Sequence, residues 1–169
     1  MVRSFLDRPL PPGALDRVLR SALRGPSAGF AQGTELLVLE GPATARYWEV
    51  TLPPARRGGF PWPGLLAAPA LVVTVADPSA YLARYAEPDK VDSGLGRSVE
   101  AWPVPYWTVD AAMAAMLALL AAVDEGLGAL FFGIFEHERA VKEAFGIPRE
   151  RQLIGTLAIG YPDPADRPS

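Results

Sequence analysis

The longest unbroken hydrophobic run of the chain covers residues 111–123 and predicts a central helix. The run is too short to span a bilayer, which takes about twenty residues, and a helix that is apolar on all sides must be buried in protein. At about 100° per residue, its alanines fall on one side and its larger side chains on the other. The alanine side is therefore expected to be a strip where another backbone comes close.

Polar residues and a glycine mark the expected ends of this helix. Thr108 is the expected N-cap, because its hydroxyl can accept a hydrogen bond from an amide of the first turn. Asp110 complements the positive end of the helix dipole. Gly126 supplies a left-handed stop.

Apolar and β-branched runs predict the strands. The clearest is 70–76, ALVVTVA, and further strands are expected at 36–39, buried on both faces, and at 152–161. The stretch 128–135, GALFFGIF, is aromatic and broken by glycines, which is typical of a short buried strand whose backbone a flat group approaches closely. This stretch is the first indication of a cofactor.

Helices and loops account for the rest of the chain. Residues 1–12 are too rich in proline for a helix and predict an extended arm, and 52–69 is predicted to be a loop. The polar, irregular connection 87–105 is long enough to indicate a functional loop or lid. The remaining helices are expected at 15–23, 42–48, 78–86 and 138–145.

No linker, repeat or low-complexity block interrupts residues 1–169, so a single domain is expected. Helices and strands alternate, which would suit a parallel α/β fold, but no glycine-rich turn matches a dinucleotide or phosphate-loop pattern. We therefore predict an α+β fold with a mixed, mostly antiparallel sheet flanked by helices.

The composition narrows the possible functions. With 16 basic against 19 acidic residues, nothing favours nucleic acid or a membrane surface as a partner. The absence of cysteine excludes disulfides, thiolate metal sites and a cysteine nucleophile. A Ser-His-Asp triad or a multi-histidine metal site would need His137, the only histidine, whose polar neighbours favour a solvated surface side chain. No metal site is therefore expected.

Two further features concern assembly and location. An apolar content of 50% is slightly high for a monomer and indicates an oligomer. The first residues include Arg3, Asp7 and Arg8 without an apolar core, so we expect no signal peptide and a cytoplasmic location.

Six segments, in order and spacing, resemble the nitroreductase family of flavin enzymes. Val2-Arg3-Ser4-Phe5, followed by Asp7-Arg8-Pro9, is similar to the end of its RRSxRxF motif, and PSAGFAQG at 26–33 is similar to its PSxxNxQPW segment. The others are Ala68-Pro69 before a strand, Asp110 opening an alanine-rich helix, Gly126-Leu127-Gly128, and Gly160-Tyr161-Pro162 after the last strand. Together they cover nearly the whole chain.

The resemblance implies a nitroreductase-like fold and a homodimer. In that family a central helix pair forms the interface, the C-terminal segment is swapped, and one FMN occupies each of two sites shared between the subunits. The alanine strip of 111–123 would suit such a helix pair.

The resemblance also implies roles for single residues. The arm residues would hold the FMN phosphate or ribityl chain, the 26–28 turn would contact the flavin of the other subunit, and 131–134 would lie beside the isoalloxazine with a backbone N–H facing its N5. Glycine suits that last place, because a side chain would hold the ring away from the main chain. The cofactor-binding residues implied are Arg3, Ser4, Pro26, Ser27, Ala28, Phe30, Gln32, Phe131, Phe132, Gly133, Ile134 and, as the C-terminal phosphate-binding cation, Arg167.

The chain departs from the family pattern in three places. The leading arginines of the first motif would precede Met1. Phe30 stands where the second motif has asparagine, and Gly33-Thr34 replaces its proline-tryptophan. The stretch before Ala68, where many members carry polar flavin contacts, holds Pro61-Trp62-Pro63-Gly64.

The function implied is an NAD(P)H-dependent flavin oxidoreductase. NADH or NADPH would deliver a hydride to flavin N5 and leave, and a flat acceptor such as a nitroaromatic or a quinone would take its place. This chemistry needs no catalytic side chain, because the cofactor carries it. We expect Trp62, Tyr106 and Trp107, with Phe30, to line the substrate slot, and 81–105 to form its lid.

Two other functions remain open. One is a flavin- or deazaflavin-binding protein of the same fold without reductase turnover, which the missing arginines and Phe30 favour. The other is a structural α+β dimer without a ligand.

Overall fold

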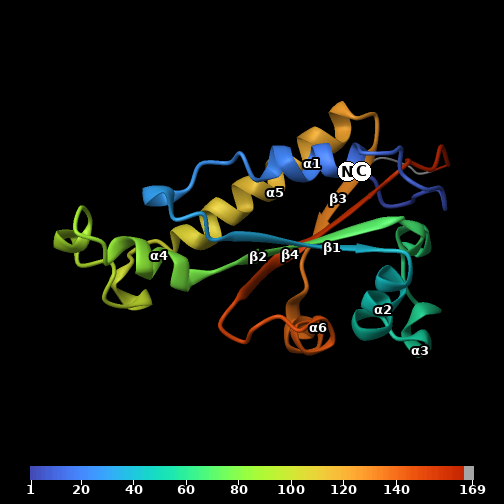
Figure 1. The fold of residues 1–169 in the computed structure, drawn as a ribbon. Coiled ribbons are helices and arrows are strands. Elements are labelled where there is room, and N and C mark those ends of the chain that lie inside the picture. The colour runs from blue at the N-terminus through green and yellow to red at the C-terminus, as the bar shows by residue number, and fades with distance from the viewer. Residues whose placement is uncertain (166–169) are drawn as a thin grey trace.

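A computed structural model describes residues 1–165 as an antiparallel sheet with helices on both faces (Figure 1). The strands are β1 (Thr34–Glu40), β2 (Ala70–Ala76), β3 (Gly128–Phe132) and β4 (Gln152–Gly160). They lie in the order β1-β2-β4-β3, and each neighbouring pair is antiparallel. The α+β prediction is confirmed, and no parallel pair occurs among these strands.

The helices form a layer on each face of the sheet (Figure 1). One layer contains α1 (Ala14–Ala22) and α5 (Tyr106–Asp124), and the other contains α2 (Pro42–Thr51), α3 (Pro54–Arg57) and α6 (Glu138–Phe145). Within the predicted loop 52–69, the chain forms α3 and a 3₁₀ turn, Pro63–Ala67.

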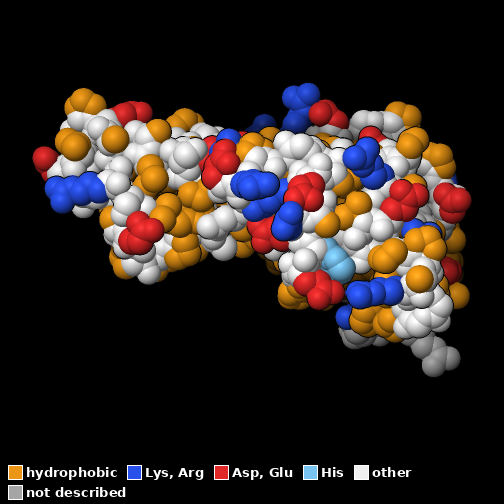
Figure 2. All heavy atoms as spheres, turned by 90° about the horizontal axis from the view of Figure 1, so that it is seen from below, with side chains coloured by type: hydrophobic (Ala, Val, Ile, Leu, Met, Phe, Trp, Pro, Cys, Tyr) orange, Lys and Arg blue, Asp and Glu red, His pale blue; other side chains and the backbone are white. Residues whose placement is uncertain are grey.

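One end of the molecule projects from the rest (Figures 1 and 2). It consists of α4 (Pro78–Tyr85) and the connection 87–105, whose only regular pieces are 3₁₀ turns at Val91–Ser93 and Val99–Ala101. Hydrophobic side chains gather on the face of this lobe that is turned to the viewer in Figure 2.

The position of a strand in the sheet explains how much of it is buried. All seven residues of β2 are buried, with Leu71 and Val73 packed against the α2 layer and Val72 against the α1 layer. A strand covered on both faces reads as an unbroken apolar run. β1 is an edge strand in which only Leu39 is buried, so the expectation that 36–39 is buried on both faces is wrong.

The start of α5 differs from the predicted one. The helix begins at Tyr106 with Pro105 in the cap position, so Thr108 lies inside the helix and is not its N-cap. The Thr108 hydroxyl donates instead to Gln152 Oε1 at 3.3 Å. At the other end, Gly126 has φ 73° and stops the helix as predicted.

Another backbone packs closely on the alanine strip of α5, as expected, but it belongs to α1 of the same chain and not to a second copy. The alanine strip is buried against the sheet as well, and is not available to a second copy. The exposed residues are Met116 (54%), Leu120 (55%) and Val123 (65%). Small side chains let α1 pack closely, so the large side chains are left on the surface. By length and mean hydropathy (1.7), α5 could also cross a membrane, a property that the core helix of a soluble protein can share.

The N-terminal arm is extended, as predicted, and closes one end of the sheet. Val2 N–H donates to the Ala129 carbonyl (3.2 Å), and Leu6 N–H donates to the Tyr161 carbonyl (2.9 Å). Phe5 between them is buried in the core. These contacts place the start of the chain beside the start of β3 and the end of β4.

Candidate functional site

A cavity of about 390 Å³ opens between the arm, α2, the segment before β2 and the end of β3. This volume is in the range of small-molecule sites. Its lining is mostly apolar and aromatic, and consists of Met1, Arg3, Tyr47, Trp48, Thr51, Leu52, Phe60, Trp62, Leu65, Leu130, Phe131, Phe132, Gly133, Ile134, Phe135 and His137.

Packed aromatic rings fix one wall of the cavity. Trp48 stacks on Phe132 with 5.8 Å between ring centroids and 10° between planes, and Tyr47 meets Trp48 edge-on at 5.2 Å. The buried Tyr47 hydroxyl lies 2.7 Å from Thr156 Oγ1. Burial raises the pKa of Tyr47 to about 12, so this phenol stays neutral. The wall is therefore rigid and uncharged, which suits a flat apolar ring.

Arg3 supplies a permanent positive charge at the same cavity. It is the only lysine or arginine among the lining residues, and its guanidinium lies 5.6 Å from the Trp62 ring centroid. Phe60 packs edge-on against Trp62 at 5.8 Å. A cation held over an aromatic face is positioned to bind an anionic group.

Main chain forms another part of the lining where β3 ends. The strand stops at Phe132, three residues before the expected end at 135. Gly133 and the buried Ile134 follow, and a 3₁₀ turn begins at Phe135. Glycine at 133 leaves the backbone uncovered by a side chain of its own.

The predicted 26–32 turn lies away from this cavity, beside α4 and the start of α5. Asp110, only 3% exposed, accepts hydrogen bonds from Ala28 N–H (2.8 Å) and from the Tyr81 hydroxyl (2.7 Å). Burial first, and the bond to Asp110 second, raise the pKa of Tyr81. Ser27 Oγ accepts from Gln32 N–H at 2.8 Å and closes the turn.

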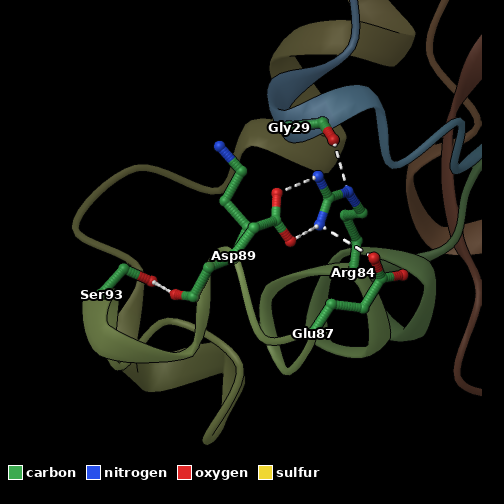
Figure 3. Close-up of polar contacts among 6 residues, drawn as sticks. Gly29, Arg84, Glu87, Asp89 and Ser93 are labelled. Carbon is green, nitrogen blue, oxygen red and sulfur yellow. Dashed lines mark hydrogen bonds and ion pairs between the residues drawn. The ribbon is translucent and has the colours of Figure 1, made fainter.

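Arg84 holds the same turn from α4 (Figure 3). Its Nε donates to the Gly29 carbonyl at 2.8 Å, while its other nitrogens bind Asp89 twice, at 2.8 Å each, and Glu87 at 3.0 Å. The turn includes Phe30, which has φ 60° and is 77% exposed. A left-handed bulky residue persists only where its surroundings hold it. The turn is therefore braced, and it presents the Phe30 ring to the surface.

The structure brings together only part of the predicted site. The predicted residues that line the cavity are Arg3, Trp62, Phe131, Phe132, Gly133 and Ile134. Ser4 is turned away and donates to Asp163 Oδ2 at 3.0 Å. The 26–32 turn packs beside α4 and does not line the cavity, and Arg167 lies outside the described residues.

Most of the predicted substrate slot and all of the predicted lid lie away from the cavity. Tyr106 and Trp107 do not line the cavity, and Trp107 is buried, with Nε1 donating to Gln152 at 3.0 Å. No residue of 81–105, all of which the structure describes, lines the cavity. Within one chain this segment cannot act as a lid over it.

His137 and Asp110 have roles that the sequence did not indicate. His137 is half-buried and lines the cavity, so the interpretation as a purely solvated surface histidine is wrong. Asp110 braces the 26–32 turn rather than only complementing a helix end. The aromatic wall from α2 was missed as well, because an amphipathic helix shows which side is apolar but not that a cavity adjoins it. Among residues 1–165, no group of three acidic or histidine side chains could hold a metal ion.

Comparisons with known proteins agree on one family and one fold. The sequence model of the nitroreductase family matches residues 1–161. An NADH dehydrogenase of Thermus thermophilus is 29% identical over an alignment of 186 positions, covering 99% of this chain and 85% of that protein.

Solved structures share the fold at lower identity. The nitroreductase CinD of Lactococcus lactis, in complex with nicotinic acid, is 18% identical with a TM-score of 0.77, covering 100% of this chain and 88% of that one. An FMN-dependent nitroreductase of Clostridium difficile is 20% identical with a TM-score of 0.67, covering 96% of this chain and 82% of that one.

Proposed function

The chain belongs to the nitroreductase family, and we propose that it is an FMN-dependent oxidoreductase that uses NAD(P)H to reduce a flat acceptor. The observation that carries this proposal is the cavity in which Arg3, Trp62 and the main chain of Gly133 meet. The resemblance implied flavin contacts for Arg3 and Gly133, Trp62 was expected in the substrate slot, and the three residues come together from separate segments of the chain.

The residues of the cavity fit the cofactor. The apolar wall of Trp48 and Phe132 would receive the isoalloxazine ring and exclude water from one of its faces. The Arg3 guanidinium would hold an anionic part of the cofactor by charge-assisted hydrogen bonds. When bound, FMN supplies the redox chemistry, since it takes a hydride from NAD(P)H and passes the hydride, with a proton, to a nitroaromatic or a quinone.

The second part of the proposal is that the site is shared between two copies of the chain. The braced 26–32 turn does not reach the cavity of its own chain, and a turn held by Asp110 and Arg84 is suited to contact the cofactor of a partner. Met116, Leu120 and Val123 form an exposed apolar stripe on α5 that a second copy would cover. We propose the homodimer with this stripe, rather than the alanine strip, in the interface.

Flavin binding tests the proposal directly. We expect the purified full-length protein to show visible flavin absorbance, or to acquire it on titration with FMN, and NADH or NADPH to bleach it anaerobically. Arg3→Gln should weaken FMN binding by about 10- to 100-fold, because hydrogen bonds to charged groups contribute about 1.5–3 kcal/mol. Arg149→Gln, at an exposed position outside the cavity, is the control and should bind as the wild type does. A protein that neither carries nor takes up FMN would refute the assignment.

The second candidate is a flavin- or deazaflavin-binding protein without turnover. Phe30, which cannot make the hydrogen bonds of the family's asparagine, favours it. Bound flavin that neither NADH nor NADPH bleaches, in the presence or absence of a quinone, would support this candidate over the reductase.

A further inference from the structure

Phe135 has an unusual conformation at the edge of the cavity. It lies two residues beyond Gly133, at the start of a 3₁₀ turn, with φ 48° and with 88% of its surface exposed. A phenylalanine in the left-handed region is strained, and an exposed ring contributes little burial to offset that strain. Such residues cluster at sites where a ligand binds or a segment switches.

The ring of Phe135 lies directly over Gly133. A Cβ atom added to Gly133 would come within 2.6 Å of Phe135 Cζ and 2.7 Å of its Cε2, far inside van der Waals contact. The ring thus covers the side of Gly133 that the missing side chain leaves open. Both residues line the cavity, so the covered side of Gly133 belongs to the cavity wall.

We propose that Phe135 is a gating residue whose ring competes with a flat ligand for this face of Gly133. The inference rests on the proposed function together with the placement, implied by the family resemblance, of the isoalloxazine beside residues 131–134. Both rings cannot occupy the same place, so binding requires the Phe135 side chain to rotate away. Because the side chain is so exposed, rotation about its χ angles can move the ring without unfolding the core.

The surroundings of Phe135 allow this motion while keeping its backbone in place. Ile134 on one side is buried, and its carbonyl accepts a hydrogen bond from His137 N–H at 3.1 Å. The backbone of the turn is therefore held at both ends of the segment. Of the two apolar residues that follow Gly133, Ile134 is buried and Phe135 is exposed, so the Phe135 ring is the one that can turn.

Competition predicts that removing the ring strengthens binding. If the ring covers Gly133 about nine-tenths of the time, the apparent Kd is about tenfold higher than that of the open form. Phe135→Ala should then lower the Kd for FMN by about tenfold and raise the association rate by a similar factor. A ring that instead closed over bound flavin would give the opposite result, because its removal would raise the Kd and the dissociation rate.

The experiment compares three variants of the full-length protein freed of flavin. FMN binding is followed by quenching of FMN fluorescence, at equilibrium and by stopped flow. Phe135→Ala removes the ring but keeps a Cβ, Phe135→Gly also relieves the left-handed strain, and Phe135→Trp keeps a planar ring as the matched control. We expect faster and tighter binding in the alanine and glycine variants and no gain in the tryptophan variant.

The outcomes separate the gate from the function on which it rests. Suppose that the wild type binds FMN and that Phe135→Ala binds FMN at the same rate or with a higher Kd. The gate is then refuted and the flavin assignment stands. Faster binding by Phe135→Gly alone would also refute it, because backbone strain and not the ring would then limit access. If neither the wild type nor any variant binds FMN, the proposed function fails together with the gate.

Discussion

The carboxylate of Asp110, at the start of the longest helix, lies 2.8 Å from the amide nitrogen of Ala28, 82 residues earlier in the chain. The same oxygen, Oδ2, also accepts from the Tyr81 hydroxyl at 2.7 Å. One buried carboxylate thus joins α5, α4 and the 26–32 turn.

Asp110→Asn should destabilise the fold. An amide places two donors where the carboxylate only accepts, and it weakens both bonds, so we expect a loss of about 1–3 kcal/mol in the free energy of unfolding. Urea denaturation measures the loss. Asp124→Asn, at an exposed position of the same helix, is the control. Equal stabilities of the two variants would contradict the structural role of Asp110.

Arg84→Met should loosen the 26–32 turn more than it affects global stability. Arg84 is the side chain that ties the Gly29 carbonyl to Asp89 and Glu87, and its loss frees that carbonyl. We expect faster amide hydrogen exchange in peptides covering 27–33 and a change in unfolding free energy of about 1 kcal/mol or less. Arg20→Met removes an exposed ion pair with Asp16 and should leave exchange in this turn unchanged.

Alkaline pH should destabilise the protein through Tyr47. Its pKa is about 12 in the fold, raised by burial above its ordinary value of 10.0. The unfolded chain therefore releases this proton first, and the stabilisation is complete below pH 10 and is lost as the pH rises from 10 to about 12.

The variant Tyr47→Phe isolates that contribution. It should be less stable near neutrality, since Thr156 loses its buried partner, and its stability should fall less steeply between about pH 10 and 12. Urea denaturation across this range tests the slope. Tyr81, whose pKa is also raised by burial, should keep the slope from vanishing. A slope identical to that of the wild type would show that the Tyr47 proton does not contribute.

Met116→Glu should dissociate the proposed dimer. It places a charge in the exposed apolar stripe of α5, and a buried unpaired charge is strongly unfavourable. Light scattering coupled to size-exclusion chromatography should show a dimer for the wild type and a monomer for the variant. Ala45→Glu adds the same charge at an exposed position of α2, in the opposite helical layer, and should remain dimeric.

The local sequence pattern was sufficient to predict an element where neighbouring residues alone determine its structure. The β-branched run 70–76 was predicted to be a strand in the core and is one, and the left-handed Gly126 ended the long helix as expected. The cap at Thr108 failed because the preceding Tyr106 and Trp107 continue the helix back to Pro105. The glycine-broken aromatic run 128–135 was a local indication of a cofactor, whereas only the resemblance connected Gly133 with Arg3 in one site.

What the sequence by itself determined is therefore most of the elements, the α+β class with a mostly antiparallel sheet, and the family. Only the tertiary structure decided that α1 of the same chain covers the alanine strip of α5, that Asp110 holds a distant turn, and that the Phe135 ring lies on Gly133. The physical reason is that periodicity fixes which side chains share a face of an element, whereas the group that covers this face is set by packing between segments far apart in the chain.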